Sequence, residues 1–204
     1  TLMNGMFYQH SSFNGDISNW NVSSVTNMQG MFWGASSFNG DLSSWDVSSV
    51  TNMAQMFRSA SSFNQDLSSW DVSSVTNMSS MFNGATSFNG DISNWDVSNV
   101  TDMTGMFDSA SDLSDENKCF INTAFQTNDA WPYDWYEFCA IEGYTYVPDD
   151  NFEQALIDLG YDDTLDDYVV TDSISGVTYL NVSSKEISDL TGIQSFTALT
   201  TLYC

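Results

Sequence analysis

A motif that recurs every 25 residues occupies the first half of the chain and constrains its fold more than any other feature. The recurring residues form rows of one type: Met6, Met31, Met56, Met81 and Met106; Phe13, Phe38, Phe63 and Phe88; Trp20, Trp45, Trp70 and Trp95. A single unit is too short to bury its own apolar side chains, so neighbouring units must stack and share one continuous core.

Within a unit, the stretch from Ile92 to Val100 has the L-x-x-L-x-L-x-x-N spacing of a leucine-rich repeat. The alternation Trp-x-Val predicts a short strand whose Trp and Val point inward and whose middle residue points outward. We therefore predict a leucine-rich-repeat solenoid of stacked parallel short strands, with an irregular or short-helical convex side. The array covers residues 1–110 as four repeats, and it opens inside a repeat, so upstream units are expected.

Two further segments follow the array. Residues 111–147 are aromatic and irregular, and we expect them to cap the array. Residues 148–204 are predicted to begin with an amphipathic helix that starts at Asp149 or Asp150 and ends at Gly160. Its apolar residues lie three or four positions apart: Phe152, Ala155, Leu156 and Leu159.

A 22-residue spacing follows this helix and predicts a second leucine-rich array, incomplete at the C-terminus. The spacing relates Val177, Leu180 and Val182 to Leu199, Leu202 and Cys204. Cys204 is therefore expected to be a small core residue, because it matches the inward position of Val182.

The charge of the chain excludes several partners. It has 27 acidic and three basic residues, for a formal net charge of −24, and its hydrophobic fraction of 42% is enough for a folded core. Nucleic acid and anionic membrane would be repelled by such a surface. No apolar run approaches the roughly 18 residues of a membrane span, so membrane insertion is not expected.

The repeated rows allow structural and functional interpretations. The Trp row could form a binding platform, but its inward position favours a place in the core. Asn21, Asp46, Asp71 and Asp96 are predicted to point outward. Either solvent and salt screen this row, or a cationic partner or Ca²⁺ neutralises it.

Two other polar rows are predicted to satisfy backbone groups in turns. They are Asp16, Asp41, Asp66 and Asp91, and Asn14, Asn39, Asn64 and Asn89.

The sequence contains few residues or motifs that could support catalysis or metal binding. His10 is the single histidine, and no phosphate loop, zinc spacing or serine nucleophile motif occurs, so we expect no enzyme activity and no required cofactor. Four clustered carboxylates are weak candidates for Ca²⁺: Asp162, Asp163, Asp166 and Asp167. They lack the spacing of a dedicated calcium loop, so any binding should be weak.

The unit M-F-x-x-A-x-S-F-N-x-D-[I/L]-S-x-W-D-V-S-S-V-T-N-M resembles the repeats of BspA-type leucine-rich-repeat surface proteins of bacteria. The stretches S-D-E-N-K-C-F-I-N-T and W-P-Y-D-W resemble the terminator that follows such arrays. V-P-D-D-N-F-E-Q-A-L-I-D-L-G-Y-D-D, with I-S-D-L-T-G-I-Q, is similar to the start of leucine-rich arrays in secreted Bacteroidetes proteins. The resemblance implies a secreted or cell-surface protein, often adhesive, that depends on export machinery.

Two covalent features follow from this implied export. Cys119 and Cys139 would form a disulfide in an oxidising compartment, with two buried thiols as the alternative. Ser109, Thr164 and Ser173 each lie in an Asp-Ser/Thr-apolar triplet that resembles an O-glycosylation acceptor of exported Bacteroidetes proteins.

These observations favour a non-enzymatic module that binds a protein or extracellular polymer through its exposed strand face. The residues expected on that face are Asn19, Asn21, Asp46, Asp71, Asn94 and Asp96. Two alternatives remain open: a passive stalk in a surface fibre or secreted cargo, and carbohydrate binding through the cap aromatics Trp131, Tyr133 and Trp135.

Overall fold

The computed structural model describes residues 1–139 and 143–204, which form two compact units. The first unit comprises residues 1–135 and the second comprises residues 136–204. The boundary lies between Trp135 and Tyr136, and so falls inside the segment 111–147 that we expected to be a single cap. No helix in the described part of the chain has the length and apolarity needed to cross a bilayer.

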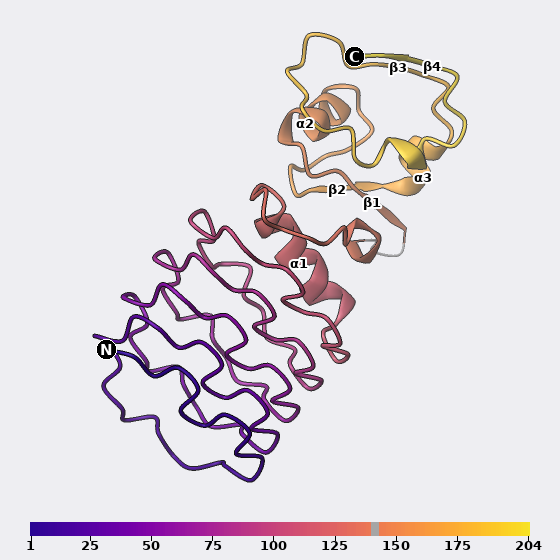
Figure 1. Cartoon of the computed structure of the whole chain (residues 1–204). Coiled ribbons are helices and arrows are strands. Elements are labelled where there is room, and N and C mark those ends of the chain that lie inside the picture. The colour runs from indigo at the N-terminus through magenta and orange to yellow at the C-terminus, as the bar shows by residue number, and fades with distance from the viewer. Residues whose placement is uncertain (140–142) are drawn as a thin grey trace. The chain divides into compact units, whose positions relative to one another are not determined.

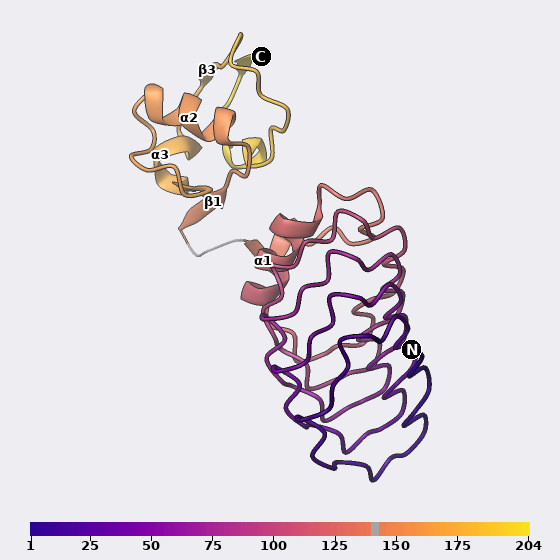
Figure 2. The ribbon, with the colours of Figure 1, turned by 90° about the vertical axis from the view of Figure 1, so that its left-hand side faces the viewer.

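The first unit is a stack of irregular coils, each 25 residues long, which Figures 1 and 2 show lying one against the next. Backbone hydrogen bonds join corresponding segments of successive coils. The N–H of Phe32 donates to the carbonyl of Met56, and the N–H of Phe57 donates to the carbonyl of Met81. Four isolated parallel bridges repeat at the same step, from Leu2–Asn27 to Asn77–Asp102.

The predicted leucine-rich-repeat solenoid of stacked parallel strands is wrong. None of the described coils contains a strand, and the sheets found in the described residues are two small two-stranded ones in the second unit. The expected Trp-x-Val strand is interrupted by tight turns, in which Trp45 N–H donates to Leu42 and Val50 N–H donates to Val47. Asp46 lies between these turns and accepts from the N–H of Ser48, so its side chain favours a turn over a ladder.

The inward rows of the repeat form one continuous core. Phe57 is fully buried, and its ring stacks on Phe63 at 3.9 Å and on Phe82 at 5.6 Å between ring centroids. Trp45, Trp70 and Trp95 are buried as well, which confirms the core interpretation of these residues. Trp20 in the first coil differs, because 38% of its surface is exposed.

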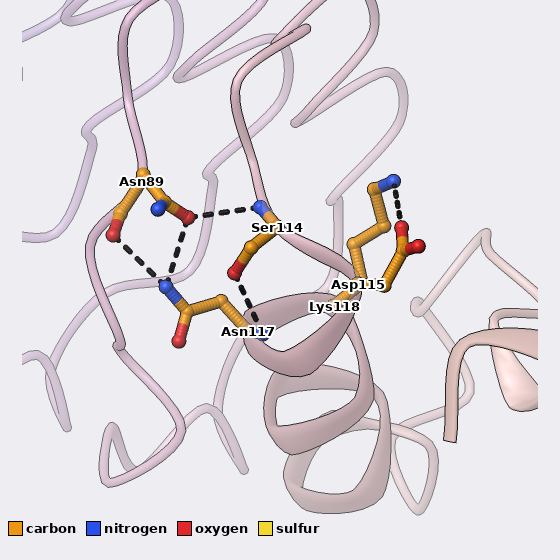
Figure 3. A network of polar contacts seen from close by, with 5 residues as sticks. All are labelled: Asn89, Ser114, Asp115, Asn117 and Lys118. Carbon is orange, nitrogen blue, oxygen red and sulfur yellow. Dashed lines mark hydrogen bonds and ion pairs between the residues drawn. The ribbon is translucent and has the colours of Figure 1, made fainter. Parts of the chain in front are cut away.

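Helix α1 (Asp115–Phe125) covers the last coil of the first unit, and sequence analysis missed it (Figure 1). Ser114 caps its N-terminus, because the Ser114 hydroxyl accepts from the N–H of Asn117. Asn89 joins this cap to the array: its side-chain oxygen accepts from the N–H of Ser114, and Asn117 Nδ2 donates to its carbonyl (Figure 3). Polar side chains thus close the end of the stack.

The second unit is a small mixed fold with its own core. Its elements in chain order are η1 (Tyr136–Cys139), β1 (Tyr144–Tyr146), α2 (Asp150–Asp158), β2 (Tyr168–Val170), α3 (Thr171–Ser175), β3 (Tyr179–Asn181), η2 (Ile193–Ser195) and β4 (Thr201–Tyr203). Strands β1 and β2 pair antiparallel, whereas β3 and β4 pair parallel. Leu180 lies opposite Leu202, so the predicted 22-residue correspondence is a register between strands.

Helix α2 agrees with the prediction for its start and for most of its apolar face. Asp149 is its N-cap and accepts from the N–H of Phe152. Phe152, Ala155 and Leu156 are buried, but Leu159 at the C-cap is 47% exposed and does not join the core. The prediction that Cys204 lies in the core is wrong: it is an exposed free thiol directly after β4, a strand whose last two residues are themselves exposed.

Candidate functional site

A row of exposed carboxylates from Asp46, Asp71 and Asp96 runs along the coils of the first unit, and we call it the outer acidic row. Asp46 Oδ1 accepts from Ser48 N–H at 3.2 Å and from the Ser48 hydroxyl at 2.6 Å. Asp71 contacts Ser73 in the same way, at 3.1 and 2.6 Å. These side chains therefore lie in turns rather than on the strand face that we expected.

The equivalent residue of the first coil is Asn21, which forms the same turn without a charge. Its Oδ1 accepts from Ser23 N–H at 3.1 Å and from the Ser23 hydroxyl at 2.8 Å. Only one oxygen of the carboxylate or amide is needed for both hydrogen bonds. The negative charge of the outer acidic row is therefore not required for the turn.

Hydrogen bonding keeps this row ionised. The hydroxyl and then the backbone N–H of Ser48 lower the pKa of Asp46 below its ordinary value. Ser73 lowers the pKa of Asp71 in the same way, while the neighbouring charges of Asp46 and Asp96 act weakly in the opposite direction. At neutral pH the row is a line of negative charges on successive coils.

A second exposed row, which we call the lateral acidic row, consists of Asp16, Asp41, Asp66 and Asp91. Each accepts a hydrogen bond from the backbone N–H of the serine two residues later, as expected for a turn. A shallow groove of about 450 Å³ includes Asp66 and Asp91 in its lining. Three of its members, Asp41, Asp66 and Asp91, provide a matched control for the outer acidic row, because each lies in the same kind of turn and carries the same charge as an outer-row residue.

The Asn14 row forms the predicted ladder. Asn39 N–H donates to the side chain of Asn14, Asn64 N–H donates to that of Asn39, and Asn89 N–H donates to that of Asn64. Asn94, which we expected on the ligand face, instead joins two coils, because its Nδ2 donates to the carbonyl of Ser68 at 2.7 Å.

Asn19 is exposed and lies beside the first turn, where its Nδ2 lies 3.5 Å from the Ser18 hydroxyl.

A groove of about 670 Å³ lies where the outer acidic row ends. It is lined by Trp95, Asp96 and Ser98 of the array and by Asn128 and Asp129 of the segment after α1, among others. Asn128 fixes that segment, because its Nδ2 donates to the carbonyls of Val97 and Val100 at 2.7 and 3.0 Å. Sequence analysis missed Asp129, since only the fold brings it near Asp96.

The aromatic side chains of the cap pack on the last coil. The rings of Tyr133 and Trp135 stack at 4.5 Å, and Trp135 lies 5.5 Å from Phe107. The Tyr133 hydroxyl accepts from Phe107 N–H and donates to Asp108, and burial raises the pKa of Tyr133. The indole of Trp131 donates to the side chain of Asn122. These polar groups are thus engaged within the protein.

The remaining candidates lie apart from these rows. Cys119 and Cys139 form the predicted disulfide. The hydroxyls predicted as glycosylation sites, Ser109, Thr164 and Ser173, belong to exposed residues.

No group of three His, Cys, Asp or Glu residues in the described part of the chain is arranged to hold a metal ion. The predicted calcium residues Asp162, Asp163, Asp166 and Asp167 therefore do not form such a group. Buried Glu153 orders this loop instead, because its Oε1 accepts from the backbone N–H groups of Asp166 and Tyr168.

Comparison with known proteins identifies one similarity. The model of a family described as "Mycoplasma protein of unknown function, DUF285" matches residues 1–124, which include the whole array and most of α1. No curated protein and no solved structure matches the chain.

Proposed function

The chain belongs to this Mycoplasma family of unknown function, and from its own surface we propose that it is a non-enzymatic extracellular binding module. The outer acidic row is proposed to bind cationic groups of a protein or polymer ligand. The BspA-type resemblance of the repeat supports an adhesive role of this kind.

The comparison between Asn21 and Asp46 carries this proposal. Both side chains make the same two hydrogen bonds to a serine, yet three successive coils use the charged residue. Like charges on neighbouring coils repel by about 1 kcal/mol even in water when they lie about 5 Å apart. The turn does not need the negative charge of Asp46, and the neighbouring carboxylates repel it. An external cation bound to the row would relieve this repulsion.

The groove at the end of the row supports a ligand with several contacts. Asp96 and Asp129 contribute carboxylates, while Trp95, Val97 and Val100 contribute apolar surface. A lysine-rich segment would suit both features, because its ammonium groups pair with carboxylates and its stems cover apolar surface.

The disulfide between Cys119 and Cys139 supports secretion or display at the cell surface. Such bonds persist in oxidising compartments and are rare in the reducing cytosol. Export machinery remains an implication of the family resemblance.

The test replaces the outer acidic row by asparagine in the variant D46N/D71N/D96N. Asn21 shows that asparagine forms the same turn, so we expect an unchanged melting temperature. The matched control D41N/D66N/D91N removes three charges from the lateral acidic row. We expect the first variant alone to lose most binding to immobilised poly-L-lysine, measured by surface plasmon resonance at physiological salt.

Equal losses in the two variants would mean that only net charge matters, and the proposed site would be rejected. Unchanged binding in both would instead favour a passive stalk.

Weak Ca²⁺ binding to the acidic loop of the second unit is a smaller, separate proposal. The Thr164 hydroxyl lies 3.3 Å from carboxylate oxygens of both Asp163 and Asp166, so these two carboxylates flank one point. We expect a higher melting temperature in CaCl₂ than in NaCl of matched ionic strength, with EDTA reversing the difference. Equal melting temperatures in CaCl₂ and NaCl would mean that general charge screening explains the whole effect.

A further inference from the structure

One surface position of the repeat changes its residue type from coil to coil. The residue that directly follows the Met-Phe step is Tyr8, Trp33, Arg58, Asn83 and Asp108 in the five successive coils. The Met and Phe residues before it remain the same in every coil. We call these five positions the variable row.

The first three side chains of the variable row form one contact series on the surface. The rings of Tyr8 and Trp33 meet edge to face, with centroids 5.0 Å apart. The guanidinium carbon of Arg58 lies 4.8 Å from the centre of the Trp33 ring. Tyr8 is 48% exposed, while Trp33 and Arg58 are partly exposed. Three large side chains from successive coils thus make one continuous patch.

The backbone beneath this patch is held firmly by the stack. Gln9 N–H donates to the carbonyl of Trp33 at 2.7 Å, and Gly34 N–H donates to the carbonyl of Arg58 at 2.8 Å. The patch is therefore pre-organised, which reduces the entropy lost when a partner binds.

Arg58 has no carboxylate partner among the described residues. The two lysines of the chain form ion pairs, Lys118 with Asp115 and Lys185 with Asp158. In the part of the chain that the structure describes, the guanidinium of Arg58 forms neither an ion pair nor a hydrogen bond, and it lies over the indole ring of Trp33. Its five N–H groups remain available to an external carboxylate.

The coils do not need large residues at this position. Asn83 and Asp108 occupy it in the fourth and fifth coils, where the preceding Phe82 and Phe107 are still buried. The Tyr, Trp and Arg side chains therefore add nothing that the repeated core requires. These three residue types are the ones most enriched among the energetically dominant residues of protein interfaces.

We propose that Tyr8, Trp33 and Arg58 form a second binding site, for a polypeptide segment that pairs a carboxylate with aromatic or aliphatic side chains. The carboxylate would accept two hydrogen bonds from Arg58, and the apolar side chains would pack on Tyr8 and Trp33. A polypeptide is favoured over a sugar polymer because Arg58 covers a face of Trp33 on which a sugar ring would stack. This site does not involve the acidic rows.

The test is selection from a phage-displayed library of random peptides on the whole protein, followed by affinity measurements. We expect the selected peptides to combine an acidic residue with apolar ones, and their affinity to fall about tenfold or more in W33N and in R58N. Asparagine is chosen because Asn83 already occupies the position in the fourth coil, so both variants should fold. The outer-row variant D46N/D71N/D96N should retain the affinity, which separates this site from the proposed cation site.

Three results would overturn the proposal: no enriched peptide, enriched peptides without acidic residues, or affinities that change less than about twofold in both asparagine variants. A fourth result would also overturn it. If the native protein binds alginate, a polymer of acidic sugars, and W33N does not, the ligand of this site is a carbohydrate.

Discussion

Replacing Trp70 by phenylalanine tests whether the tryptophan row is part of the core. Trp70 is 4% exposed, and its indole N–H donates to the carbonyl of Leu42 at 3.0 Å. The ring also stacks on Trp95, with centroids 6.3 Å apart. Trp20 provides the matched control, because it occupies the same repeat position, is 38% exposed and has no hydrogen-bond partner for its indole among the described residues.

Two losses determine the expected effect at Trp70. The carbonyl of Leu42 would lose its indole donor but would keep the hydrogen bond from the N–H of Trp45, so this loss costs about 0.5 to 1.5 kcal/mol. The smaller side chain also has two fewer buried carbons besides the lost indole nitrogen, worth roughly 2 kcal/mol at about 0.8 kcal/mol per carbon. Trp70→Phe should therefore destabilise the protein by roughly 3 kcal/mol. Trp20→Phe should cost about 1 kcal/mol or less, because the first loss is absent.

Differential scanning calorimetry of both variants measures the difference. For a chain of this length, the expected loss at Trp70 lowers the melting temperature of the first unit by on the order of 10 °C. Equal shifts for Trp70→Phe and Trp20→Phe would refute the argument, since burial and the indole hydrogen bond would then contribute nothing measurable.

Two other perturbations have defined outcomes. Replacing both Cys119 and Cys139 by serine should destabilise the protein by about 3 kcal/mol, the value expected for a loop of this size, and a reductant should lower the melting temperature of the native protein but not of the variant. Glu153→Gln should raise the melting temperature at neutral pH, because burial raises the pKa of Glu153 above 4.5 and the ionised form is disfavoured in the folded state. The stability linked to its proton is complete below pH 4.5 and is lost as the pH rises through the folded-state pKa, so native protein and variant should converge in acid. An unchanged difference across that range would contradict the assignment.

The core of the first unit could be predicted from the sequence because repetition identifies it directly. Met, Phe and Trp residues at a 25-residue step must face one another in neighbouring coils, and Phe57 and Trp70 are buried as expected. Helix α2 could also be predicted from the sequence, since Asp149 is a strong N-cap and Gly160 ends the apolar pattern. These signals are local or exactly periodic.

The path of the backbone within each coil could not be derived in the same way. Trp-x-Val alternation suggests a strand, but the side chain of Asp46 competes by binding Ser48. A serine two residues after each such Asp was the available signal for a turn. Helix α1 was not predicted because it contains few apolar residues, although Ser114 and the acidic residues after it form a recognisable helix start.

The groove and the variable row depend on the fold itself. Asp129 comes near Asp96 only because Asn128 binds the carbonyls of the last coil. The contact between Trp33 and Arg58 follows from the stacking of two coils, and no local sequence motif predicts it.

The most direct test of the proposed function compares the native protein, D46N/D71N/D96N and D41N/D66N/D91N on immobilised poly-L-lysine, at one salt concentration and with the melting temperature of each protein measured in parallel. The two variants differ from the native protein by the same change in charge, and all retain the oxygen that accepts the serine hydrogen bonds. We predict equal melting temperatures, near-native binding by D41N/D66N/D91N and the loss of most binding by D46N/D71N/D96N. Near-native binding by D46N/D71N/D96N would contradict the assignment of the outer acidic row as the ligand-binding site.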